Sequence, residues 1–431
     1  MLWHPYHAGL GLSLGVTVAH IHMFGRWALS LSHSCRVDSR RAVMLLIPFA
    51  TGAFASAASA LDPVASALKN GGAYVESSAG TALYQYRADD RFIPASTAKL
   101  ATAGAALHDL GARFRFRTEF FLTSRHCLVI RGGGDPSMTS RELRRIASAL
   151  AERVSQVACL WLDDRRFELP ERVDGQGATT NPFDAPVSAF PVNFNTVTIQ
   201  KRGAAQIRSG EEETPLVPFA RELARGLPNG SHRINLGGSQ QASRYALQLL
   251  AALLRERGVQ VADVVRPEFV QDSAAPLYVH ESSETLEQVV SQMLRYSTNL
   301  TANQIFLVLG AQQFGYPATI AKGQRAVQQF LRRVVGWREG QIMEGSGLSR
   351  ETKATPREMV TLLKWFEKHR ELLPIDSGFQ AKTGTLTGVN ALAGYFTRGD
   401  GTRARFALLI NAPTSARYKF QVAEMLRRVV G

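Results

Sequence analysis

The sequence predicts a mixed fold of the α/β (α+β) class, with an antiparallel sheet built from both ends of the chain and a helical lobe between them. Runs rich in β-branched and aromatic residues indicate strands at 73–77 and 81–87, and again at 388–397 and 402–410. A glycine-containing turn joins each pair, which favours two hairpins. The two ends of the chain therefore supply the strands of one sheet, and flanking helices cover it.

Helical segments fill much of the remaining main domain. The small-residue run at 97–110 predicts one helix, and 284–310 predicts two helices broken around Ser297. A capping box with proline at its first helical position starts another helix over 355–369. Apolar residues at helical spacing predict a last helix at 416–430.

The stretch at 122–275 differs from its surroundings, with short strands, a glycine-rich turn and a long apolar helix. We interpret it as an inserted domain. The predicted division is thus a leader with a signal peptide at 1–60, a catalytic domain made of 61–121 and 276–431, and the insertion at 122–275.

The leader is predicted from its order of residues. Two arginines precede an apolar stretch at 42–54, and Ala58–Ala60 supplies the small residues of a cleavage site. We expect export and a mature chain that begins near Leu61, and the alternative is an uncleaved membrane anchor. Cys127 and Cys159 then reach an oxidising compartment, where either a disulfide or two buried thiols would fit the sequence.

The formal net charge of +14 favours acidic surroundings such as nucleic acid, anionic lipid or a carboxylate-rich polymer. The sequence has no basic run interleaved with aromatic residues and no zinc-finger spacing, so we expect no nucleic-acid partner. We also expect no cofactor and no metal. The basic surface would instead suit peripheral association with a membrane or an acidic polymer.

Three short motifs carry candidate chemistry: Ser96–Lys99, Ser297–Asn299 and Lys382–Thr385. A Ser-x-x-Lys pattern is weak alone, and Ser66–Lys69 repeats it within an ordinary amphipathic helix. Ser96 differs because Pro94 ends an extended segment just before it, which places Ser96 at a helix N-terminus. Free backbone N–H groups there favour developing negative charge.

The spacing of these residues suits acyl transfer. Lys99 lies on the same helical face as Ser96 and can take its proton if burial or a neighbouring cation, Lys382, keeps the lysine neutral. Gly384 would let substrate lie against the strand, and the Thr385 amide would join the Ser96 amide as an oxyanion hole. Ser297 would relay a proton to the leaving amine, and Asn299 would hold the substrate peptide. Thr383 completes the predicted substrate-binding strand.

Each motif also has a purely structural interpretation. Ser297 and Asn299 would serve as helix caps, and Lys99 and Lys382 would be solvated surface charges. The order of the motifs along the chain decides against this, because a helix start, a helix break and a final strand follow one another as in penicillin-recognising serine enzymes.

Further runs extend this likeness: 92–99, 132–136, 185–189, 193–197, 345–350 and 381–385 followed by 392–395. Through them the mature chain resembles the class C low-molecular-mass penicillin-binding proteins, the D-alanyl-D-alanine carboxypeptidase/endopeptidase family. The resemblance implies a transpeptidase-like domain with an insertion between the first two motifs and an acyl-enzyme on Ser96. It also implies peptidoglycan stem peptides as substrates, β-lactams as covalent inhibitors, and a periplasmic location.

The chain departs from the family at three places. Thr298 stands where relatives often have Asp or Asn, the insertion is shorter than usual, and the segment between Pro374 and Lys382 is too short to wall the cleft. The short segment predicts an open cleft that favours cross-linked peptides. The competing functions are a β-lactamase-like hydrolase and a non-catalytic peptidoglycan-binding protein.

One substrate contact is predicted within the insertion. Asp163 and Asp164, with Phe167, are expected near the cleft mouth, where the Asp164 carboxylate could pair with the free amine of a diamino-acid stem peptide. The alternative is that the two aspartates only end a strand in a turn.

Overall fold

The computed structural model of the protein describes residues 62–262 and 269–431. The predicted signal peptide lies outside these residues. None of the helices in the described part is long and apolar enough to cross a membrane.

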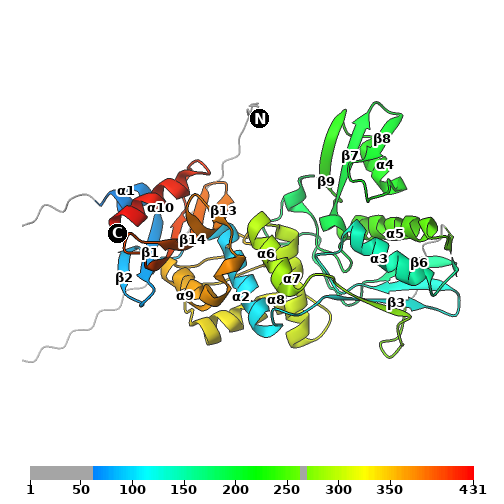
Figure 1. Cartoon of the computed structure of the whole chain (residues 1–431), viewed down its shortest axis with the longest axis horizontal. Coiled ribbons are helices and arrows are strands. Elements are labelled where there is room, and N and C mark those ends of the chain that lie inside the picture. Colours follow the sequence, from blue (N-terminus) through cyan, green and yellow to red (C-terminus); the bar gives the residue numbers. More distant parts are fainter. Residues whose placement is uncertain (1–61, 263–268) are drawn as a thin grey trace, which may run out of the picture. The chain divides into compact units, whose positions relative to one another are not determined.

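The main sheet has six antiparallel strands in the order β12-β13-β14-β15-β1-β2 (Figure 1). The pairing of β1 with β15 joins the two ends of the chain, with a register from Gly71↔Ile410 to Ser77↔Ala404. The predicted antiparallel sheet is therefore confirmed. The strands are β1 (Gly71–Ser77), β2 (Ala82–Tyr86), β12 (Ile375–Asp376), β13 (Phe379–Leu386), β14 (Val389–Thr397) and β15 (Arg403–Ile410).

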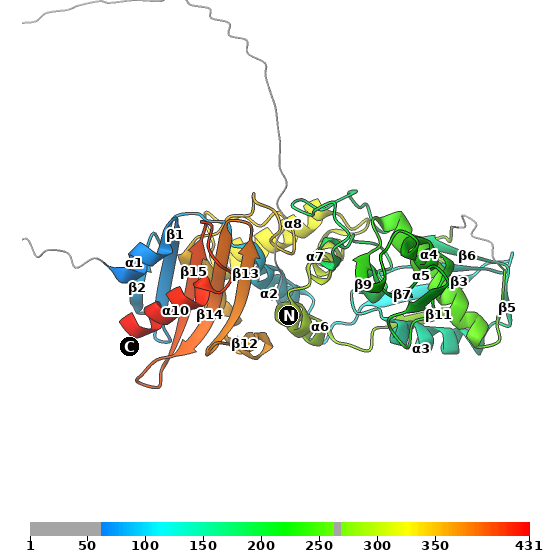
Figure 2. The same ribbon diagram turned by 90° about the horizontal axis from the view of Figure 1, so that it is seen from above.

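Each face of this sheet is covered by helices. Helices α1 (Pro63–Leu68) and α10 (Tyr418–Val429) pack on one face, where Phe379, Phe396 and Phe406 form the centre of a separate apolar core (Figure 2). The other face meets the main core of the protein. The sheet thus holds β13 between two packed layers, which fixes the strand that carries the third motif.

The helical lobe packs against that other face. Its members are the 3₁₀ turn η1 (Ala95–Ala98), α2 (Lys99–Asp109), α6 (Leu286–Tyr296), α7 (Asn299–Phe314), α8 (Ile320–Phe330), the π-turn η4 (Leu331–Val335), α9 (Pro356–Phe366) and η5 (Glu367–Leu372). The break between α6 and α7 falls at Ser297, as the sequence predicted. Helix α7 is buried over most of its length and crosses α8 closely: a Cβ on Gly310 would lie 2.4 Å from the Gly323 nitrogen.

The inserted segment contains a four-stranded sheet in the order β11-β3-β4-β6 and a three-stranded sheet in the order β8-β7-β9. Strands β3 and β11 pair with each other, so the inserted segment runs from 117 to 281, a few residues beyond the predicted 122–275 on each side. Its strands are β3 (Arg117–Leu122), β4 (Cys127–Arg131), β5 (Gln156–Val157), β6 (Cys159–Asp163), β7 (Thr196–Arg202), β8 (Gln206–Ser209), β9 (Gly230–Asn235), β10 (Gln260–Val261) and β11 (Tyr278–Glu281). Its helices are α3 (Ser140–Ala151), α4 (Pro218–Ala224), α5 (Ser239–Glu256) and the short turns η2 (Pro182–Asp184) and η3 (Asn193–Asn195).

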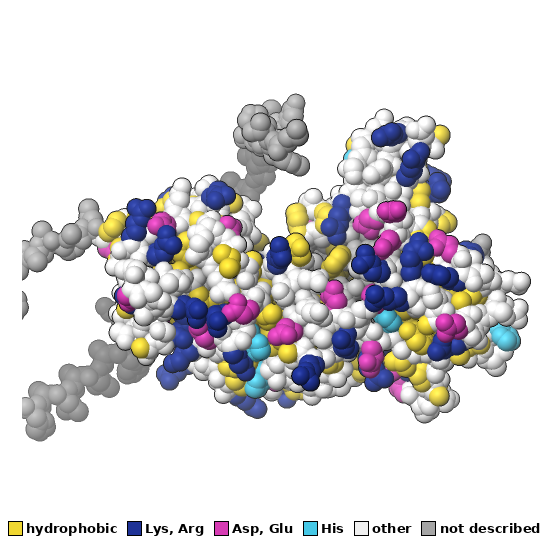
Figure 3. Space-filling view, viewed as in Figure 1, with side chains coloured by type: hydrophobic (Ala, Val, Ile, Leu, Met, Phe, Trp, Pro, Cys, Tyr) yellow, Lys and Arg dark blue, Asp and Glu magenta, His cyan; other side chains and the backbone are white. Residues whose placement is uncertain are grey.

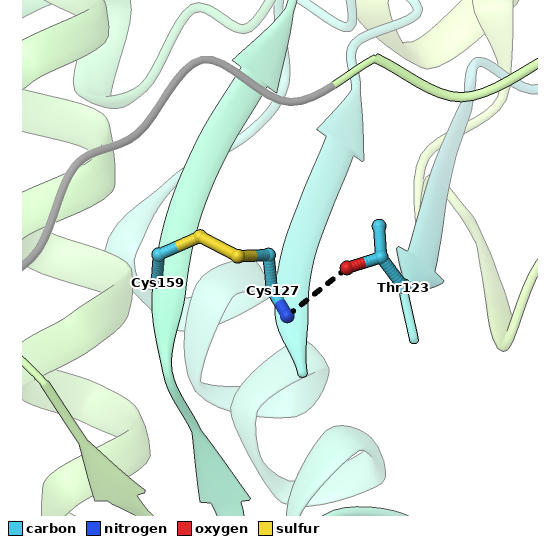
Figure 4. The surroundings of a disulfide bond; sticks show 3 residues. All are labelled: Thr123, Cys127 and Cys159. Atoms are coloured by element: carbon cyan, nitrogen blue, oxygen red, sulfur yellow. Dashed lines mark hydrogen bonds between the residues drawn. A yellow bond between two sulfur atoms is a disulfide. The ribbon is translucent and has the colours of Figure 1, made fainter. Parts of the chain in front are cut away.

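A disulfide joins two strands of the inserted segment. Cys127 and Cys159 are opposite each other on the parallel strands β4 and β6, with Cα atoms 4.5 Å apart (Figure 4). The sequence left a disulfide and two free thiols equally open, and the structure has the disulfide.

Candidate active site

Ser96 lies in the 3₁₀ turn η1, which leads directly into α2. The preceding residue, Ala95, has a φ of 47°, a conformation that costs energy for a residue with a Cβ. Gly347 touches this turn from the other side, because a Cβ there would lie 2.1 Å from the Ala95 carbonyl oxygen. The backbone around Ser96 is thus bent and held by close packing, which aims its hydroxyl into the site.

Lys99 is fully buried and makes three polar contacts through its amine. Nζ lies 2.9 Å from Ser96 Oγ, 2.8 Å from Asn299 Oδ1 and 2.7 Å from the Ser346 carbonyl oxygen. A neutral amine has two N–H donors and one lone pair. The two oxygens that can only accept take the donors, and the lone pair is left facing the Ser96 hydroxyl.

The protonation state of Lys99 follows from its surroundings. Burial and, after it, the positive charge of Lys382 hold the pKa of Lys99 well below its usual range, while Glu344 opposes this shift. Lys99 is therefore suited to accept the proton of Ser96. The first motif thus holds a serine hydroxyl and a buried amine at hydrogen-bonding distance, an arrangement that can supply a nucleophile and its general base.

Asn299 connects the second motif to the inserted segment. It is the first residue of α7, and its Oδ1 accepts from Lys99 while its Nδ2 donates to the Phe183 carbonyl at 3.0 Å. Ser297 ends α6 in the left-handed conformation, with a φ of 57°. Ser297 lines the same cavity as Asn299.

Strand β13 carries the third motif. Gly384 packs directly on the turn of the nucleophile, because a Cβ there would lie 2.7 Å from the Pro94 carbonyl oxygen and 3.1 Å from the Ala95 Cβ. Lys382 is buried, and its Nζ donates to the Thr383 carbonyl at 2.9 Å. Strand β12 pairs only with the start of β13, at Phe379 and Gln380. Among the described strands none pairs with the outer edge from Lys382 on, so a substrate peptide can add there as a strand.

A third lysine lies behind this strand. Lys419 of α10 is buried, and its Nζ donates to the Gly384 carbonyl at 2.7 Å and to Thr385 Oγ1. Burial lowers the pKa of Lys419 to about 8. Burial, together with the charge of Lys419, lowers the pKa of Lys382 to about 7. Sequence reasoning missed Lys419, since nothing in the pattern of α10 separates it from a surface lysine.

Glu344 and Ser346 were also missed. Glu344 is fully buried and accepts hydrogen bonds from the Ser346 amide at 2.8 Å and the Ser349 amide at 3.3 Å. These contacts fix the loop whose Ser346 carbonyl accepts from Lys99. The run at 345–350 stood out in the sequence, but no role was assigned to it.

The predicted placement of Asp164 at the cleft mouth is wrong. The turn after β6 pairs with Ala318, which follows the C-terminal end of α7, through hydrogen bonds to Arg166 and Glu168. Asn299 lies at the opposite end of this 16-residue helix, about 24 Å away at about 1.5 Å per residue. Asp163 pairs with Arg131 and Arg165, so the aspartates end a strand in a structural turn.

The segment that precedes the third motif and borders the cleft is short, as the sequence indicated. Residues 375–380 form a hairpin of two-residue β12 and the start of β13, with Ser377 and Gly378 at positive φ in its turn. Ile375 is 76% exposed.

Comparison with known proteins finds a family that spans most of the chain. The D-Ala-D-Ala carboxypeptidase 3 (S13) family model matches residues 57–226, 222–377 and 369–429. The chain is 27% identical over 428 residues to a D-alanyl-D-alanine carboxypeptidase of Actinomadura sp., with 81% of this chain and 79% of the relative covered. It is 24% identical over 400 residues to the D-alanyl-D-alanine carboxypeptidase DacB of Haemophilus influenzae, with 76% and 82% covered.

The fold is also similar to a solved structure. The crystal structure of penicillin-binding protein 4 from Haemophilus influenzae superposes with a TM-score of 0.68 at 21% identity, and the match covers 84% of this chain and 98% of that one. By the extent of the family match, the chain belongs to the D-Ala-D-Ala carboxypeptidase 3 (S13) family.

Proposed function

We propose that this protein is a serine D-Ala-D-Ala carboxypeptidase and DD-endopeptidase that acts on peptidoglycan stem peptides through an acyl-enzyme on Ser96. The arrangement of Lys99 carries the proposal: its buried Nζ lies 2.9 Å from Ser96 Oγ and is held in place by Asn299 Oδ1 and the Ser346 carbonyl. Because burial and Lys382 hold the pKa of Lys99 well below its usual range, this amine can take the Ser96 proton as a general base.

The reaction then proceeds in two stages. Lys99 takes the hydroxyl proton as Ser96 Oγ attacks the carbonyl of the penultimate D-alanine, and the Ser96 and Thr385 amides stabilise the oxyanion. The C–N bond breaks, the amine leaves with a proton passed through Ser297, and the acyl group stays on Ser96. Water, deprotonated by Lys99, then attacks the ester and releases the acid and the free serine.

The substrate lies along the open edge of β13 in this proposal. Gly384 leaves room for it, Thr383 and Thr385 supply hydrogen-bonding groups, and Lys382 contributes positive charge for the terminal carboxylate. The short hairpin at 375–380 leaves space beside the strand, which supports cleavage of bulky cross-linked peptides as well as trimming of free ones.

A β-lactam would acylate Ser96 in the same way, and a crystal structure of the Haemophilus influenzae protein is of a complex with a β-lactam. We place the enzyme in the periplasm, where its substrate lies. Its basic side chains do not form one patch on the face shown in Figure 3, where lysines and arginines are scattered with acidic residues among them. On this face, charge would give only diffuse association with the wall or a membrane.

Fluorescent penicillin labelling tests this function. Ser96→Ala should abolish labelling, because Ser96 combines the start of a helix with a buried lysine on the same face. Ser66→Ala should label like the wild type, since Ser66 is exposed in α1 and repeats only the spacing of the motif. Labelling that survives in the Ser96 variant would show that the nucleophile lies elsewhere. An unlabelled wild type would favour a protein that only binds the wall, and rapid loss of the label would favour a β-lactamase-like hydrolase.

A further inference from the structure

The cavity that Ser297 and Asn299 line opens beside the catalytic residues. Its volume is about 520 Å³, and it lies between the inserted segment and the junction of α6 with α7. Ser297 and Asn299 belong to its wall, so it is continuous with the active site. The lining residues are Pro182, Phe183, Phe194, Thr196, Arg233, Gln292, Tyr296, Ser297, Thr298, Asn299 and Leu300.

A strained turn presents an aromatic ring to this cavity. Asn193, Phe194 and Asn195 all have positive φ, at 51°, 58° and 48°. The two buried asparagines are held by their side chains: Asn193 bonds the amide and hydroxyl of Ser140, each at 2.8 Å, and Asn195 donates to the Pro186 carbonyl at 2.7 Å. Such a backbone persists only where its surroundings fix it, and it marks functional positions. Here it fixes the place of Phe194.

The chemistry of the cavity wall indicates its ligand. Phe183 and Tyr296 are 58% and 70% exposed and stand on the same cavity wall, so together they offer an apolar surface to a ligand. Arg233 is the charged residue of the lining. Its Nε donates to Thr196 Oγ1 at 3.2 Å, and its guanidinium lies 5.9 Å from the centre of the Phe194 ring.

Arg233 is free to bind an anion. Within the described part of the chain, no carboxylate forms an ion pair with it. Arg233 also lines a neighbouring recess that contains Glu211, Glu212 and Glu213. None of these three forms an ion pair with Arg233 in the described part of the chain: Glu211 accepts from Thr198 and Thr214, and Glu213 pairs with Arg141. A planar guanidinium with unused donors beside an aromatic ring suits a carboxylate attached to an apolar group.

The position of Ser297 indicates which part of a substrate would enter the cavity. Ser297 delivers the proton to the leaving amine in the proposed mechanism, so the leaving group departs on this side. A single D-alanine is small for a cavity of this size, whereas the leaving group of a cross-linked substrate is a whole second stem peptide with free carboxylates. We propose that the cavity binds this leaving peptide, with a carboxylate on Arg233 and its apolar part against Phe194 and Tyr296. The inference rests on the proposed function and names the substrate that the cavity selects.

The test compares two substrates in one variant. Arg233→Gln should lower kcat/KM for a cross-linked muropeptide dimer by on the order of tenfold, since a charge-assisted hydrogen bond is lost. Cleavage of monomeric pentapeptide and the rate of penicillin acylation should stay at the wild-type level, because neither places a second peptide in the cavity. Arg208→Gln is the matched control, an exposed arginine of β8 in the same small sheet that does not line the cavity. Phe194→Leu should show the same selective loss.

A second substrate tests whether the cavity recognises the charge or the shape of the leaving peptide. It is a cross-linked dimer in which the carboxylates of the leaving peptide are amidated. The wild type should cleave it as slowly as Arg233→Gln cleaves the unmodified dimer, and the variant should show no further loss. Equal loss on dimer and pentapeptide, or no loss on either, would overturn the assignment of the cavity. Failure of the proposed function looks different, because a wild type that neither reacts with penicillin nor cleaves either substrate would show it.

Discussion

Three buried lysines are coupled across the active site. The positive charge of Lys419 lowers the pKa of Lys382, and the positive charge of Lys382 lowers the pKa of Lys99. Each is also removed from water, so burial disfavours the charged form of all three. Burial, together with repulsion at Lys382 and Lys99, thus holds the pKa values of all these lysines below the usual range.

The coupled lysines predict an unusual pH dependence of stability. An unfolded lysine has a pKa of about 10.4, whereas the pKa of Lys382 is lowered to about 7 and that of Lys419 to about 8. The unfolded chain thus binds more protons than the folded chain between about pH 7 and 10, so the free energy of unfolding should rise with pH across this window. Urea denaturation at pH 7 and pH 9 measures it.

The variant Lys382→Met provides the control for this prediction. It removes one titrating lysine, so its urea midpoint should rise less between pH 7 and pH 9 than that of the wild type. A wild-type midpoint that stays constant or falls over this range would contradict the pKa directions of these lysines.

For single residues, the sequence predicted the contacts between side chains that lie a few positions apart in the chain. Ser96 and Lys99 meet because residues three apart share a helical face, and the structure shows them in contact. Glu344 and Lys419 reach the site from distant segments, and no local pattern marks them. Asp164 was misplaced because its direction depends on the pairing of its turn with Ala318, which only the tertiary fold determines.

Among the elements, the contact of β13 with η1 sets the geometry of the site. The two approach so closely that Gly384 and Gly347 both lie against the backbone of Pro94 and Ala95. A side chain at either position would push the strand or the loop away from Ser96. The absence of two side chains thus lets β13 approach the turn that carries Ser96.

Gly384→Ala tests this contact. The added Cβ would lie 2.7 Å from the Pro94 carbonyl oxygen, so β13 must shift by a fraction of an ångström. We expect penicillin acylation to slow by on the order of a hundredfold, since small displacements in a reacting geometry have effects of that size. Stopped-flow acylation measures it. Gly226→Ala is the control, because a Cβ there meets nothing within 4 Å, and its rate should match the wild type. A normal rate in Gly384→Ala would show that the contact is not needed.

The sequence predicted the elements of the main sheet well because each has a local signal. Glycine turns separate the strands of both hairpins, and the proline capping box starts α9 at Pro356. The limits of the inserted segment were harder to place, since β3 and β11 pair across more than a hundred and fifty residues and neither strand alone shows its partner. Long-range pairing of short strands has no signature in a single sequence.

In the molecule as a whole, the inserted segment is held to the helical lobe by buried polar contacts. Gln304 of α7 donates to the Gly134 carbonyl at 3.1 Å and the Ser188 carbonyl at 2.9 Å, and its Oε1 accepts from the Ser188 amide at 3.2 Å. Together with the bond from Asn299 to Phe183, these contacts hold the wall of the cavity against Ser297 and Asn299. The inserted segment therefore contributes residues to the cavity wall. The disulfide lies elsewhere in it, between β4 and β6 of the four-stranded sheet.

The disulfide should stabilise the protein without affecting its chemistry. Cys127 and Cys159 are 32 residues apart, and closing a loop of this length stabilises a folded chain by about 3–4 kcal/mol in the chain-entropy model. The double variant Cys127→Ala with Cys159→Ala should lose about that much free energy of unfolding in urea. Penicillin acylation of the folded variant should keep the wild-type rate, because the contacts of Lys99 come from α7 and the loop at Ser346, not from β4 or β6. Slower acylation by a fully folded variant would show instead that the sheet of the insertion is coupled to the nucleophile, and an unchanged urea midpoint would show that the bond does not restrain the unfolded chain.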